Sequence, residues 1–88
     1  MVLNDKSCLI CGTTHDLHVH HVFFGTANRR KSEKHGMKVY LCREHHTGNS
    51  GVHHNKQLDL EVKMWAQGKF EETHSRQHFI NIFGKNYL

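Results

Sequence analysis

The order of hydrophobic and polar positions predicts two short strands in the first half of the chain. Residues 17–24 (LHVHHVFF) form an apolar run that histidines interrupt, which is typical of a strand. Residues 37–42 (MKVYLC) alternate between apolar and polar side chains. That alternation predicts a second strand with one buried face.

A helical period replaces the alternation in the second half of the chain. Residues 52–72 place four apolar side chains on one stripe: Leu58, Val62, Trp65 and Ala66. A second, short helix should begin after Ser75 as N-cap and end at Gly84, with Phe79, Ile82 and Phe83 on one face. We expect both apolar faces to form the core by covering the sheet and each other.

Polar segments separate these elements. Residues 25–36 (GTANRRKSEKHG) are bounded by glycines and predict a loop, with room for one helical turn after Ser32. Residues 43–51 predict a second loop. The expected fold is a small α+β fold, a ββα unit preceded by a turn rich in cysteine and followed by one more helix.

The size of the chain indicates that its hydrophobic core is too small to stabilise the fold alone. Its 88 residues predict one domain, residues 1–88, of which 36% are hydrophobic. A chain of this size buries only about 60–65% of the surface that its unfolded form exposes, and small cores of this kind are usually stabilised by disulfides or metal. Three cysteines cannot all pair, and neither a secretory leader nor an apolar run near 18 residues is present. We therefore expect a cytoplasmic protein, without a membrane partner, whose cysteines bind metal.

The cysteines have the spacing of a zinc knuckle. Cys8 and Cys11 are three residues apart and Gly12 follows them, which suits a turn that directs two thiolates at one ion. Cys42 ends the second predicted strand and is followed by His45 and His46, either of which could supply the fourth ligand. The Cys-x2-His spacing favours His45. These residues predict a structural zinc site.

The histidines of the first strand suggest a second metal site. His20 and His46 could hold a divalent metal, and His53, seven residues after His46, could complete that site. His21 would then be free as a general base, because imidazole has a pKa of about 6.5 and is largely neutral at pH 7. A regular strand would instead place His18 and His20 on one face and assign the metal to that pair.

Three segments, CLICG, LHVHHVF and VYLCREHH, resemble the HNH endonuclease family, which has a ββα-metal fold and here an added zinc knuckle. They are most similar to small HNH-type proteins of phages and prophages, and more distantly to RecA-dependent phage recombination nucleases. The resemblance implies a metal-dependent DNA endonuclease in the cytoplasm of a bacterial host, with a recombination or phage DNA-processing partner. It places the general base at His21 and metal ligands at His20 and His46.

Two departures from the family pattern bear on the chemistry. The position of the motif asparagine is Met37, so another residue must orient the base, with Asn28 and Asn55 as candidates. Position 20 is histidine where many HNH proteins have aspartate. Ligation by imidazole alone suits zinc, nickel or another transition metal better than magnesium.

The charge of the chain points to an anionic partner. The formal net charge is +4 and the pI is about 9.2, which favours nucleic acid. Arg29, Arg30 and Lys31 lie between the predicted strands and could contact DNA phosphates, which carry no sequence information. The sequence also allows a non-catalytic, zinc-stabilised DNA-binding or adaptor domain with a degenerate HNH site, and a knuckle that only binds protein. It leaves the oligomeric state open.

Overall fold

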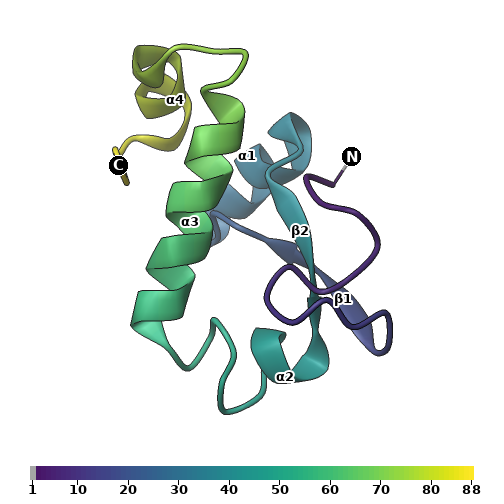
Figure 1. Cartoon of the computed structure of the whole chain (residues 1–88). Coiled ribbons are helices and arrows are strands. Elements are labelled where there is room, and N and C mark those ends of the chain that lie inside the picture. Colours follow the sequence, from purple (N-terminus) through teal and green to yellow (C-terminus); the bar gives the residue numbers. More distant parts are fainter. Residues whose placement is uncertain (1) are drawn as a thin grey trace.

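Two antiparallel strands form the centre of the molecule in the computed structural model, which describes residues 2–88 (Figure 1). Strand β1 spans Leu17–His21 and strand β2 spans Lys38–Cys42. Their pairing is regular, with Leu17 opposite Cys42 and His21 opposite Lys38. The first strand is shorter than predicted, because it ends at His21 and residues 22–24 leave the sheet.

The segment between the strands is a helix, so the predicted loop is wrong. Helix α1 spans Thr26–His35. It ends at Gly36, whose φ of 70° is left-handed and whose N–H donates to the carbonyl of Ser32. The Ser32 hydroxyl is buried and donates to the carbonyl of Phe23 at 2.6 Å. Since Ser32 is the one buried residue of α1, the helix has no apolar stripe that a sequence pattern could reveal.

The remaining helices follow β2. A short helix, α2 (Arg43–His46), occupies the start of the predicted second loop. Helix α3 spans Lys56–Phe70, shorter at both ends than predicted, and is capped by the side chain of Asn55. Helix α4 spans Arg76–Phe83 with Ser75 as N-cap and Gly84 as left-handed C-cap, which confirms the predicted bounds.

The core lies between the sheet and the last two helices. Val62 and Ala66 are buried as predicted, and Leu58 and Trp65 pack against the buried core while partly exposed. The Phe23 ring, just after β1, is 5.2 Å from that of Phe79 and 4.6 Å from that of Phe83. The Phe residues of α4 therefore close one end of the molecule.

The predicted burial pattern of β2 needs one correction. Val39 and Leu41 are fully buried, as the alternation predicts, but Lys38 on the other face is only 9% exposed. Helix α1 supplies the reason, since Glu33 accepts a hydrogen bond from the Lys38 ammonium at 2.7 Å. The architecture is a small α+β fold of two strands and surrounding helices. Over residues 2–88, none of these helices has both the length and the apolar character needed to cross a bilayer.

Candidate metal centres and catalytic cleft

The N-terminal turn and the end of β2 bring four metal-ligating side chains together. The turn folds through bonds from the Cys8 N–H to the carbonyl of Thr13 and from the Gly12 N–H to the carbonyl of Cys8, both 2.8 Å. Gly12 has a φ of 79°, which favours glycine. The ligand atoms of the resulting Cys3His group lie within 4.8 Å of one another; its members are Cys8, Cys11, Cys42 and His45.

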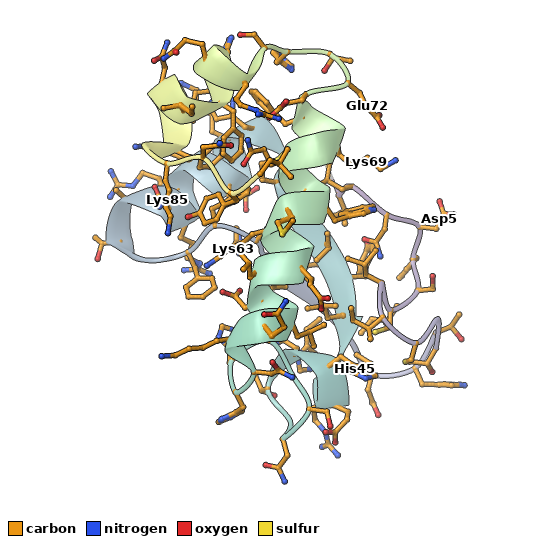
Figure 2. All side chains as sticks on the ribbon, turned by 60° about the vertical axis from the view of Figure 1, so that its left-hand side comes forward. Asp5, His45, Lys63, Lys69, Glu72 and Lys85 are labelled. Carbon is orange, nitrogen blue, oxygen red and sulfur yellow. The ribbon has the colours of Figure 1, made fainter. Side chains whose placement is uncertain are left out.

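The separations within this group are those of a tetrahedral zinc site. With Zn–S near 2.3 Å and Zn–N near 2.05 Å, a tetrahedron places sulfurs about 3.8 Å apart and sulfur and nitrogen about 3.5 Å apart. The sulfurs of Cys11 and Cys42 are 3.8 Å apart, and His45 Nδ1 lies 3.7 Å from the Cys8 sulfur and 3.2 Å from the Cys42 sulfur. The group is therefore consistent with zinc, and it contains His45 rather than His46. Figure 2 shows His45 on α2 beside the N-terminal loop.

The cysteine environment also favours a thiolate. Burial raises the pKa of the Cys8 thiol, but backbone N–H groups of Cys11, Cys42 and Ile10 aim at its sulfur, and the net effect lowers that pKa to about 6. Burial raises the pKa of Cys42. One thiolate is thus formed readily at neutral pH, and a bound cation would stabilise the others.

A second cluster joins His20 of β1, His46 of α2 and His53 of the turn that precedes α3. One ring nitrogen from each lies within 4.8 Å of the others. The Nε2 atoms of His46 and His53 are 3.2 Å apart, close to the 3.35 Å or so that two imidazoles on one tetrahedral zinc would show. The donor set and its spacing fit a transition metal with an open coordination position.

Backbone contacts hold His53 in place. The N–H of Val52 donates to the carbonyl of His45 at 2.9 Å, and that of His53 to the carbonyl of His46 at 3.3 Å. Gly51 makes this approach feasible, because a Cβ there would lie 2.7 Å from the His46 carbonyl oxygen. His53 therefore belongs to a turn packed on α2, rather than to the start of the long helix as the sequence suggested.

The imidazole of His20 is buried and incompletely hydrogen-bonded among the residues that the structure describes. It is 2% exposed, and its Nε2 has no hydrogen-bond partner among the residues that the structure describes. Burial, followed by repulsion from His46 and His53, lowers the pKa of His20 to about 3. The pKa of His46 is lowered to about 4, again chiefly by burial. Both rings are neutral at pH 7, the state in which imidazole binds metal.

His21 faces helix α1 rather than the cluster interior. Strand β1 is regular to its end, so His20 and His21 project to opposite faces. The Nε2 of His21 lies 2.9 Å from the Glu33 carboxylate, whose other oxygen accepts from Lys38. Hydrogen bonds from Lys38 and then His21 lower the pKa of Glu33 to about 2, so the carboxylate is ionised.

Glu33 is the residue that the sequence analysis missed. The sequence offered Asn28 and Asn55 as residues that could orient His21, but the structure places the Glu33 carboxylate against that ring. The Asn55 side chain instead caps α3 by accepting from the Leu58 N–H at 3.1 Å. No sequence signal singled out Glu33, because the segment was interpreted as a loop. Its helical position directs the carboxylate at the end of β1.

Two adjoining cavities meet at His21. One, of about 270 Å³, is lined by all three cluster histidines together with His21, Val19, Phe24 and Arg29. The other, of about 410 Å³, is lined by His21, Thr26, Arg29, Arg30 and Glu33. Because β1 ends at His21, His20 and His21 border the same cleft although they project to opposite faces of the strand. Arg29 lines both cavities and Arg30 the larger one, whereas Lys31 lines neither and lies with Lys34 beside a separate depression.

Comparison with known protein families, curated proteins and solved structures finds no match to this chain.

Proposed function

We propose that the chain is a metal-dependent DNA endonuclease of the HNH type, in which His21 is the general base. One observation carries the proposal: a cluster of three histidines and a fourth, carboxylate-bound histidine open into the same cleft. A structural cluster would explain the first three, but it does not explain why His21 borders the same cleft.

The contact between His21 and Glu33 supports His21 as the general base. Its Nε2 contacts the ionised Glu33, so in the neutral ring Nε2 carries the proton and donates it to the carboxylate. The lone pair is then on Nδ1, which can accept a proton from water as that water attacks a phosphodiester phosphorus. Glu33 also stabilises the imidazolium that forms. Lys38 holds the carboxylate from the other side.

The three-histidine cluster would hold the divalent cation. His20, His46 and His53 supply neutral nitrogen ligands, which favours zinc or another transition metal over magnesium. A cation bound there would supply Lewis-acid stabilisation of charge on the phosphate and on the leaving oxygen. The Cys3His group is too closed for this task and serves as the structural site.

Helix α1 would contact the DNA backbone. Its cationic side chains outnumber its one carboxylate, and that carboxylate is already bound by His21 and Lys38. Arg29 and Arg30 border the cleft and can each bind a phosphate by two parallel hydrogen bonds. Contacts of this kind position DNA without selecting a sequence.

A plasmid-nicking assay tests the proposal. Supercoiled plasmid is incubated with zinc-loaded protein and a panel of divalent metals, and His21→Ala is compared with His78→Ala, which alters an exposed histidine of α4. We expect nicking by the wild type and by His78→Ala, with a loss of about 10²- to 10⁴-fold in His21→Ala. A metal-independent band shift without nicking would instead favour the non-catalytic DNA-binding domain.

A further inference from the structure

His18 makes a contact that the proposed reaction does not use. It lies on the same face of β1 as His20, and its Nδ1 is 2.9 Å from the Nδ1 of His46. The two rings meet edge to face, with centroids 5.1 Å apart. His18 does not belong to the group of three whose nitrogens converge. It therefore contacts a candidate ligand from outside the site.

The positions of the protons on these rings follow from the geometry. The Nε2 of His46 is the atom that approaches His53, so it must present a lone pair if the cluster binds a cation. A neutral His46 then carries its proton on Nδ1. The only acceptor placed for that proton, among the residues that the structure describes, is the Nδ1 of His18. His18 must accordingly carry its own proton on Nε2.

We infer that His18 is a positioning residue, which fixes the tautomer and ring orientation of His46 so that His46 Nε2 faces the cation. The inference rests on the proposed metal site and extends it by one residue. Metal-bound histidines usually donate their second N–H to an acceptor, which orients the ring and makes it more basic. Here a neutral imidazole takes the place of the more common carboxylate or carbonyl.

Two substitutions separate hydrogen bonding from packing. In His18→Asn, the side-chain oxygen occupies roughly the place of Nδ1 and retains an acceptor for His46. His18→Leu keeps a side chain of similar size without an acceptor. His15→Leu is the matched control, because His15 is an exposed histidine before the same strand. Each protein is first loaded with one zinc ion, and binding of a second zinc is then measured by calorimetry.

We expect the wild type, His15→Leu and His18→Asn to bind the second ion with similar affinity, and His18→Leu to bind it about 10- to 100-fold more weakly. Equal affinity in His18→Leu, or an equal loss in both His18 variants, overturns the role of His18 while leaving the metal site in place. No second ion in the wild type overturns the metal site itself, and the inference with it.

A spectroscopic measurement on the wild type does not depend on the folding of any variant. Nitrogen chemical shifts distinguish the two neutral tautomers of histidine. With two zinc ions bound, we expect His46 to be protonated at Nδ1 and His18 at Nε2. The reverse assignment for His46 refutes the inference.

Discussion

Loss of the Cys3His site should unfold the chain. The perturbation is Cys11→Ser, which removes one ligand whose sulfur lies 3.8 Å from that of Cys42. Cys11 is exposed, so the substitution removes little apolar packing. Its effect therefore reports the metal site rather than the core.

The expected loss is as large as the whole stability of the chain. A protein of 88 residues is stable by about 4–13 kcal/mol, taking roughly 0.05–0.15 kcal/mol per residue. A structural zinc contributes about 10–16 kcal/mol at pH 7 in small zinc domains. The site also joins segments far apart in sequence, since Cys8 and Cys11 precede β1 and Cys42 ends β2. We therefore expect the core formed by the strands and helices of residues 2–88 to be insufficient without the ion.

Circular dichroism during chelation and zinc titration measures the effect. The wild type should lose its helical signal with a strong chelator and recover it with zinc, whereas Cys11→Ser should show little helix at any zinc concentration. Ile10→Ser, which alters the exposed neighbouring side chain, is the control and should behave as the wild type does. A metal-free wild type that keeps its helical signal and a cooperative thermal transition would refute the reasoning.

Three further predictions follow from the cleft and its surroundings. Arg29→Ala should weaken binding to duplex DNA equally for all sequences and reduce the slope of log affinity against log salt by about 1. Lys69→Ala, in the last turn of α3 (Figure 2), is the control and should leave the slope unchanged. Glu33→Ala should lower the kcat of nicking about 10- to 100-fold with little change in KM, because it removes the acceptor that orients His21; an unchanged kcat would exclude that role. The pKa of His20 is lowered to about 3 in the folded chain, so below pH 6.5 the unfolded chain binds a proton there that the folded chain does not. The free energy of unfolding should therefore be highest above pH 6.5 and fall as the solution becomes more acidic. In protein carrying one zinc, urea unfolding at pH 7 and pH 5.5 should show a decrease about 1 kcal/mol larger in the wild type than in His20→Asn, and equal decreases would contradict the burial of a neutral imidazole.

The sequence was informative where ligands follow short-range rules. Cys8 and Cys11 share one turn, and Cys42 and His45 share the junction of β2 with α2, so their spacing alone indicated the zinc group. The ends of α4 could also be predicted, because Ser75 and Gly84 cap the helix through interactions with residues close by in the sequence.

Contacts between residues far apart in the sequence could not be predicted. Helix α1 buries only Ser32, so its pattern of polar residues matched a loop, and the contact of Glu33 with His21 could not be foreseen. The direction of His21 depended on whether β1 remains regular to its last residue, which the sequence left open. The contact between His18 and His46 likewise requires α2 to pack beside β1, and it joins residues 28 positions apart.

Anomalous scattering at the zinc edge, from crystals grown with excess zinc, tests the central claim most directly. We expect two peaks per chain, one enclosed by Cys8, Cys11, Cys42 and His45 and a second among His20, His46 and His53 that borders the cleft of His21. A single peak at the cysteines, with the three imidazoles hydrogen-bonded only to one another or to water, would contradict a catalytic metal site.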